Sequence, residues 1–182
     1  GKVQLYIPPV FIDKSRKNEI YQGHWHVNKN VEISSNIQNL KSIMKFNGFG
    51  TYVKEDKSVV EGIFREGELD GPGRVIVSNG DLFKGIYQNG FLNDKGIFID
   101  HVGNVYDGQF KLNTMDGYGE EIFVDKSSFK GEYKRNKKNG RGKFVWNDGS
   151  YYEGELLDNM LHGKGVHQWA SGLRYEGDWY KG

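Results

Sequence analysis

The stretch Tyr152-Glu-Gly-Glu-Leu-Leu-Asp-Asn-Met-Leu-His-Gly-Lys-Gly165 is a clear copy of a pattern that recurs along this chain of 182 residues. In each copy a glycine, here called the anchor glycine, has a bulky residue two positions before it and another two positions after it. The last six anchor glycines are spaced by 23 residues. The seven are Gly23, Gly62, Gly85, Gly108, Gly131, Gly154 and Gly177. A fixed period of this length predicts a repeat array.

The residues around each anchor glycine predict a β-strand. The flanking bulky residues follow a period of two and share a face with the glycine, while the positions between them are mostly polar. Glycine weakens a strand unless something approaches closely, so we expect a ring of the neighbouring repeat over each bare Cα. An aromatic face that stays open would form an apolar groove for a partner helix or a second copy. The candidate groove residues are Tyr21, Trp25, Phe64, Phe83, Tyr87, Tyr106, Phe110, Phe129, Tyr133, Tyr152, Tyr175 and Trp179.

Two turns are expected in each repeat. Five residues after the anchor glycines stand only Gly or Asn, which tolerate positive φ and predict a tight turn. These are Asn28, Gly67, Gly90, Asn113, Asn136, Asn159 and Gly182. Gly-x-Gly pairs such as Gly163 and Gly165 then open a predicted second strand, over 75–77, 97–99, 121–124, 143–146 and 166–169. A second turn, such as Asp148-Gly149, leads to the next anchor, so each repeat is a predicted β-hairpin.

Single hairpins are only marginally stable, so the repeats are expected to stack edge to edge. The predicted fold is all-β, an elongated single-layer twisted antiparallel sheet of stacked hairpins of about 23 residues. We assign 20–182 to seven repeats, the last truncated, and 1–19 to an N-terminal cap or degenerate repeat. Gly23 and Gly62 are 39 residues apart, which leaves a 16-residue insertion within 26–47. For its segment 31–46 a short helix and a longer hairpin are both open, and its role is either that of a surface loop or that of a binding loop.

Composition narrows the class of protein. Aromatic residues make up 14% of the chain, which argues against disorder, and only 3 prolines accompany 26 glycines, which argues against collagen. The absence of cysteine excludes disulfides, thiolate nucleophiles and cysteine-based zinc sites. No apolar run reaches the ~20 residues of a membrane-spanning helix. We expect a cytoplasmic protein, and a first residue other than Met suggests a piece of a longer chain, with Gly1 either native or a tag remnant.

The quoted stretch and Tyr175-Glu-Gly-Asp-Trp179 resemble the MORN (membrane occupation and recognition nexus) repeat. The resemblance covers about residues 20–182, with departures at Val60, Asp94 and Lys126 and in the insertion. It implies a module without its own reaction, since catalytic residues in enzymes of this family lie in another domain. It also implies protein–protein binding and dimerisation, in a cytoskeletal or ciliary assembly or at the membrane cortex. The alternative is a phosphoinositide-binding or regulatory module of a larger enzyme, such as a phosphatidylinositol phosphate kinase or a SET-domain methyltransferase.

Catalytic and cofactor chemistry finds little support in the residues. The Gly-x-Gly pairs recur in the repeats and lack the Lys-Ser/Thr of a phosphate loop, so we interpret them as structural. His24 and His26 share a strand face, but no further ligands complete a metal site. No Ser/His/Asp grouping can be placed. We therefore expect no catalytic residue, no metal and no cofactor.

Charge is unevenly distributed although the net charge is only +1. A candidate basic patch consists of Lys130, Lys134, Arg135, Lys137, Lys138, Arg141 and Lys143, and segments 60–82 and 106–128 on its N-terminal side are acidic. The patch either docks on an acidic protein surface, contacts anionic lipid headgroups or is only a solvated turn. Flanking acidic bands disfavour lipid, and the small net charge disfavours nucleic acid. The leading hypothesis is a non-enzymatic scaffold that binds protein partners and self-associates as a homodimer.

Overall fold

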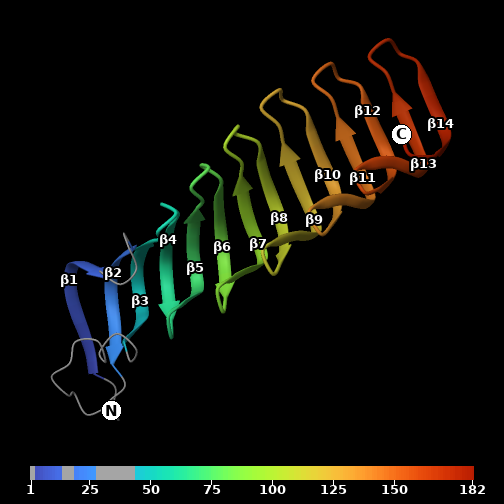
Figure 1. The fold of residues 1–182 in the computed structure, drawn as a ribbon. Coiled ribbons are helices and arrows are strands. Elements are labelled where there is room, and N and C mark those ends of the chain that lie inside the picture. Colours follow the sequence, from blue (N-terminus) through green and yellow to red (C-terminus); the bar gives the residue numbers. More distant parts are fainter. Residues whose placement is uncertain (1–2, 14–18, 28–43) are drawn as a thin grey trace. The chain divides into compact units, whose positions relative to one another are not determined.

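The computed structural model of the protein describes residues 3–13, 19–27 and 44–182 (Figure 1). In these ranges every regular element is a β-strand, and no membrane-spanning helix is present in them. The strands are β1 (Val3–Asp13), β2 (Glu19–Val27), β3 (Met44–Val53), β4 (Val59–Arg65), β5 (Glu68–Ile76), β6 (Leu82–Gln88), β7 (Phe91–Ile99), β8 (Val105–Lys111), β9 (Thr114–Ile122), β10 (Ser128–Lys134), β11 (Lys137–Val145), β12 (Tyr151–Leu157), β13 (Met160–Gln168) and β14 (Arg174–Trp179).

The chain divides into two compact units, Gly1–Phe91 and Leu92–Gly182. In the first unit β1 to β6 lie side by side in chain order, and in the second unit β7 to β14 do the same. Neighbouring strands are antiparallel, and consecutive strands form hairpins (Figure 1). The predicted fold class is thus confirmed: each unit is a single-layer antiparallel sheet of stacked hairpins.

The first turn of each described hairpin has two central residues with positive φ. In the β10–β11 turn φ is 50° at Arg135 and 65° at Asn136, and Glu66 and Gly67 have φ of 52° and 93°. Two consecutive residues of this kind form a type I′ turn, whose twist matches that of the flanking strands. The predicted positive φ at the Gly/Asn position is therefore confirmed wherever that position is described, while Asn28 lies outside the described residues.

Asparagine at this turn also joins one repeat to the preceding one. The Asn136 backbone N–H donates to the Met115 carbonyl at 2.9 Å, and the Asn136 Oδ1 accepts from the Met115 N–H at 2.7 Å. Asn159 makes the same pair of bonds with Lys138. Where glycine takes the position, as at Gly90, the backbone bond to the preceding repeat is kept and a side-chain acceptor is absent. An asparagine at this turn thus adds a second hydrogen bond to the preceding repeat.

Glycines form a row that crosses the strands of each unit at one level, and we call this the glycine row. In the first unit Gly23 faces Gly50, and Gly62 faces both Gly50 and Gly73. In the second unit the row consists of Gly96, Gly108, Gly119, Gly131, Gly142, Gly154, Gly165 and Gly177. The anchor glycine of one strand therefore meets the second glycine of a Gly-x-Gly pair or, at Gly108, the glycine of Asp94-Lys-Gly96.

The second strands begin earlier than the sequence predicted. β11 starts at Lys137, so Gly140 and Gly142 lie inside the strand instead of opening it. The reason is a register shift between Gly131 and Tyr133, where β11 carries extra residues. Gly140 has a φ of 87° at this bulge, which is a conformation that glycine adopts at little cost. The first glycine of each pair is thus a bulge residue, and the second belongs to the glycine row.

A ring covers each described glycine pair of the second unit from β8 onward, but it comes from the same repeat and not from the neighbouring repeat as expected. A Cβ built on Gly131 would lie 2.7 Å from the Phe129 Cζ and 2.5 Å from the Gly142 Cα. Tyr106 and Tyr152 cover their own anchor glycines and the opposite glycines in the same way. The side chain two positions before the anchor folds forward along its own strand, because both facing residues lack a Cβ.

The β4–β5 hairpin uses another residue for the same purpose. Here Val60 stands in the place of the leading ring and is too short to reach across the glycine pair. The Leu69 side chain from β5 fills the space instead, and it would lie 2.9 Å from a Cβ built on Gly62 or on Gly73. Leu69 is only 4% exposed. The slot above the glycines is therefore filled from either strand.

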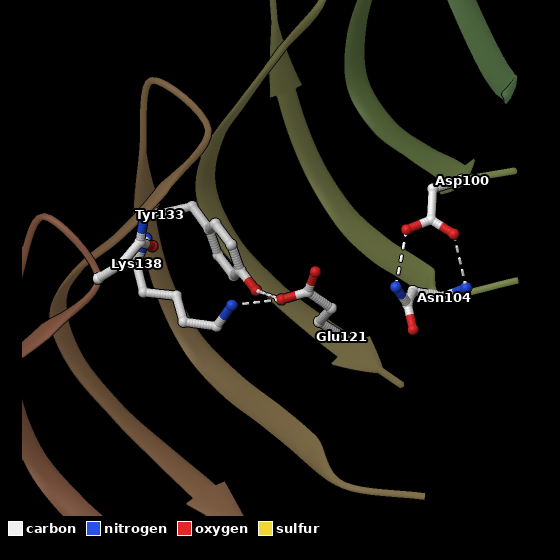
Figure 2. A network of polar contacts seen from close by, with 6 residues as sticks. Asp100, Asn104, Glu121, Tyr133 and Lys138 are labelled. Atoms are coloured by element: carbon white, nitrogen blue, oxygen red, sulfur yellow. Dashed lines mark hydrogen bonds and ion pairs between the residues drawn. The ribbon is translucent and has the colours of Figure 1, made fainter. Parts of the chain in front are cut away.

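Short polar side chains hold the second turn in several repeats. Asp125 and Asp148 accept hydrogen bonds from the serine two positions later, and both serines, Ser127 and Ser150, are buried. The hydrogen bond from the Ser127 hydroxyl is the main cause of a lowered pKa at Asp125. At Asp100 partial burial acts to raise the pKa, but hydrogen bonds from Asn104 and its neighbours outweigh it and lower the pKa (Figure 2). Lys57 and Lys126 have φ of 73° and 71° at the position where the other described turns of this kind have glycine.

Some predictions fall outside the described residues. The greater part of the insertion, 28–43, is among them, so the choice between helix and hairpin stays open. In the N-terminal segment β1 pairs with β2, with a register shift between Ile7 and Phe11. The assignment of 1–19 as a cap or degenerate repeat stays a prediction.

Candidate functional site

The face of the sheet that carries the rings, here called the ring face, is largely filled by its own side chains. Exposed fractions are at most 5% for the predicted groove residues Phe64, Tyr87, Tyr106, Phe110, Phe129, Tyr133 and Tyr152. The Tyr106 ring meets Phe110 and Tyr133 edge to face, with centroids 5.3 Å and 4.9 Å apart. These rings pack on glycines and on each other, so they do not line an open groove. The difference from the expectation arises because the glycine row lets the rings lie flat.

The remaining predicted groove residues differ in exposure. Phe83 and Trp179 are half-buried, and Tyr175 is 43% exposed. The side chains of Tyr21 and Trp25 lie outside the described part. An aromatic cluster that the sequence analysis did not single out adjoins Trp179: His167 stacks between Trp146 and Trp169, with ring centroids 5.0 Å and 4.1 Å apart. Partial burial lowers the pKa of His167, and Asp148 opposes this shift.

A polar cluster interrupts the ring face between β9 and β11. Lys138 forms an ion pair with Glu121, and the Tyr133 hydroxyl donates to the same carboxylate at 2.9 Å (Figure 2). The Lys138 Nζ also lies 5.2 Å from the centroids of Phe123 and Phe129. The side chains of Lys138 and Glu121 are only 16% and 18% exposed. Burial, followed by the charge of Glu121, raises the pKa of Tyr133 above its ordinary value. Because each polar group here already has a partner within the chain, the cluster holds neighbouring repeats together.

The opposite face, here called the charged face, carries ion pairs between neighbouring strands. Lys130 pairs with Glu120 across β10 and β9 at 3.4 Å, and Lys143 pairs with Glu153 across β11 and β12 at 3.1 Å. Lys143 also lies 4.4 Å from the centroid of the Tyr151 ring. In the first unit Arg74 bonds Glu61 at 2.7 Å. The predicted alternation of polar residues on this face is thus confirmed, and opposite charges meet across strands.

The residue directly after the anchor glycine caps the bulge of the next strand. Glu132 Oε1 accepts from the Arg141 N–H at 3.1 Å, and Gln109 Oε1 accepts from the Tyr118 N–H at 2.6 Å. A Cβ at Gly140 would lie 2.5 Å from Glu132 Oε2, so glycine at the bulge makes room for this carboxylate. Glu132 therefore satisfies a backbone group that the bulge leaves without a strand partner.

A groove of about 760 Å³ lies on the charged face of the second unit and crosses β9 to β14. Its floor includes Gly142, Gly154, Gly165 and Gly177 of the glycine row, whose Cβ positions point to the ring face, so that only backbone lies at this level of the charged face. Its walls are long charged side chains together with Tyr118 and Val166. The charged residues are Lys130, Glu132, Arg141, Lys143, Glu153, Lys164, Glu176 and Asp178. The surface that is free to accept a ligand is thus on the charged face.

The structure distributes the predicted basic patch over three places. Lys130, Arg141 and Lys143 line the groove on the charged face. Lys138 lies on the ring face in the polar cluster. Lys134, Arg135 and Lys137 lie at the β10–β11 turn, where Lys137 approaches Asp158 at 3.7 Å. These residues do not form one continuous patch, because alternate residues of a strand point to opposite faces.

Several residues of the groove were missed by sequence reasoning. Lys164 and Tyr118 recur with Arg141 at the 23-residue period, in the position between the two glycines of each Gly-x-Gly pair. Trp146 and Trp169 recur in the same way after the second strand. The period was therefore a signal that could have identified both sets. His24 and His26 lie in β2, in the part of the chain whose side chains are not described.

The model of the MORN repeat family matches residues 61–82, 106–128, 129–151 and 152–174, which together make up half of the chain. The chain therefore belongs to the MORN repeat family. Segments around Gly23, Gly85 and Gly177 are not among the matched ones, and their assignment as repeats stays a prediction. The comparison with curated protein sequences gives no significant match.

Among solved structures, the chain is similar to the SAS-4 (dCPAP) TCP domain of Drosophila melanogaster in complex with a proline-rich motif of Ana2 (dSTIL), at 11% identity and a TM-score of 0.46 over 96% of this chain and 88% of that one. It is also similar to the TCP10 domain of Danio rerio CPAP in complex with a peptide of STIL, at 16% identity and a TM-score of 0.42 over 72% and 70% of the two chains.

Proposed function

We propose that this chain is a non-enzymatic scaffold module that binds a polypeptide partner across its charged face. The observation that carries the proposal is the groove over β9 to β14, which lies open on a rigid sheet and exposes backbone between charged walls. A polypeptide can approach such a floor closely, because the side-chain positions of the row point to the ring face and only backbone lies between the charged walls. The aromatic face supports this role by packing the strands together.

We extend the proposal to the setting of the protein. Membership in the MORN repeat family favours a cytoplasmic scaffold in a cytoskeletal or ciliary assembly, with self-association as a second property. The exposed Tyr175 and Tyr180 at the end of the second unit are apolar surface that a second copy could cover. Light scattering after size exclusion tests this part: a dimer is expected at high protein concentration, and a monomer at every concentration would contradict it.

Site-specific cross-linking tests the binding role. A photoreactive phenylalanine derivative in place of Val166 in the groove is expected to cross-link one discrete polypeptide in cells. The same derivative in place of Lys126, an exposed turn residue outside the groove, is the control. The cross-linked polypeptide must then bind the purified protein, and Val166→Lys must weaken that binding. Equal labelling from both positions, or none from Val166, would reject the groove as a binding site.

A further inference from the structure

The groove has equal numbers of basic and acidic side chains, but several of them already form ion pairs or hydrogen bonds within the chain. Lys143 and Glu153 are already paired with each other, and Lys130 is paired with Glu120. Glu132 is engaged by the backbone of β11. Glu176 is paired with Arg174 at 2.8 Å. A partner can therefore form ion pairs most readily with the charged side chains that take part in none of these contacts.

Two cations of the groove take part in no such contact. In the part of the chain that the structure describes, the backbone N–H groups of Arg141 and Lys164 are bonded, but no hydrogen bond or ion pair engages their side-chain charges. Both side chains are exposed. Glu155 stands opposite Arg141 and Asp178 stands opposite Lys164 in the register, without an ion pair in either place, and the Glu155 carboxylate accepts from the Lys164 N–H. Among the described residues, the unpaired side-chain charges of the groove are thus Arg141 on β11, Lys164 on β13 and Asp178 on β14.

The spacing of these two cations is fixed by the sheet. Arg141 and Lys164 occupy the same position of consecutive repeats, two strands apart, which corresponds to about 9.6 Å between their backbone positions. A polyproline II segment brings every third residue to the same side, at a repeat of about 9.3 Å. In a β-strand the residues on one side are about 6.8 Å apart, which does not match. Tyr118 continues the same row on β9 with an exposed ring.

We propose that the groove binds an acidic polypeptide segment in polyproline II conformation, with carboxylates three residues apart on Arg141 and Lys164. The proposal rests on the proposed function and specifies its partner chemistry. Arginine accepts a carboxylate through two parallel N–H bonds, so Arg141 fixes one end of the register, while Lys164 supplies a point charge at the next carboxylate.

Fluorescence anisotropy with labelled synthetic peptides tests this proposal. The probe is (Glu-Pro-Pro)₄, and the comparison peptides are neutral (Gln-Pro-Pro)₄ and (Glu-Pro)₆, in which the carboxylates are two residues apart. We expect (Glu-Pro-Pro)₄ to bind most tightly and to weaken as salt increases. The variant Arg141→Gln/Lys164→Gln should weaken its binding about tenfold, the combined value of two exposed ion pairs.

A matched control removes the same charge elsewhere. Lys134→Gln/Arg135→Gln neutralises two exposed cations at the β10–β11 turn and should change the affinity less than twofold. Equal losses in both double variants, or equal binding of the three peptides, would overturn the proposal. Vesicles of phosphatidylcholine with phosphatidylserine form a further arm: vesicle binding that depends on Arg141 and Lys164, without peptide binding, would replace the peptide by a lipid surface. A partner cross-linked at Val166 that lacks such an acidic segment would reject this inference and leave the proposed function standing.

Discussion

The β4–β5 and β10–β11 hairpins have the same register and fill the space above their glycine pair in different ways. In β4–β5 the leading residue is Val60, and Leu69 from the second strand covers the glycines. In β10–β11 the leading residue is Phe129, and its ring covers the glycines. The position of Leu69 is then occupied by Lys138, which reaches Glu121 in β9, the strand before this hairpin, instead.

This difference shows that a repeat needs one filler above its glycines, supplied by either strand. When a ring supplies it, the opposite position is released from packing and can carry a charge. At this position Lys138 forms an ion pair with Glu121. No other described repeat places lysine and glutamate at these two positions. We expect a partly buried ion pair of this kind to favour one order of repeats over others that have the same hydrophobic pattern.

The largest expected effect comes from closing the slot itself. Gly131→Val should destabilise the protein by about 4 kcal/mol or prevent folding, because a Cβ there would meet both the Gly142 Cα and the Phe129 ring. Urea denaturation followed by circular dichroism measures it. The control is Gly149→Ala, where nothing lies within 4 Å and only the φ of 84° is unfavourable, at about 1 kcal/mol. Wild-type stability of Gly131→Val would contradict our account of the glycine row.

Removing the filler distinguishes the two hairpins. Leu69→Ala should cost about 3 kcal/mol, because it leaves a cavity above Gly62 and Gly73. Met115→Ala, at the corresponding position of the β8–β9 hairpin, should cost only about 1 kcal/mol, since Tyr106 already covers the glycines there. Thermal unfolding of the two variants under identical conditions provides the comparison. Equal losses would show that the two positions have the same role.

The polar cluster can be converted into an apolar one. Lys138→Leu alone should cost about 2 kcal/mol, because it leaves the partly buried Glu121 carboxylate without its cation. Adding Glu121→Val and Tyr133→Phe should recover most of the loss, since no polar group then remains unpaired. Chemical denaturation of the single and triple variants measures both steps. If Lys138→Leu has wild-type stability, the ion pair contributes nothing to folding.

The smallest effect concerns the bond between turns. Asn136→Gly keeps the positive φ but removes the acceptor for the Met115 N–H, at a cost of about 1 kcal/mol. Hydrogen exchange at the Met115 amide should become faster, which locates the loss. Asn136→Asp keeps an acceptor oxygen and should preserve the slow exchange. Unchanged exchange in Asn136→Gly would mean that the side-chain bond does not form in solution.

Much of the fold could be predicted because the same local sequence features recur every 23 residues. The anchor glycines, the Gly/Asn turns and the alternation of faces are all local properties, and the structure confirms them where it describes them. The start of the second strand could not be predicted, because the bulge at Gly140 depends on its pairing with Gly131 and Tyr133. The expectation of an open aromatic groove was wrong, because the burial of a ring depends on what it meets across the sheet, and the sequence of one strand does not show this.

The repeat, the hairpin, the family and the polar character of one face can be read from the amino-acid sequence, because each follows from residue types at fixed spacing along one strand. Which ring lies over which glycine, and which charges carry no ion pair, depends on how the strands pair in space. Arg141 and Lys138 belong to one basic run in the sequence, yet the pleat of β11 sends one into the groove and the other under the rings. The sequence of one strand does not show which residues of other strands it will pair with. This pairing decides which charges form ion pairs within the sheet and which remain accessible to a partner.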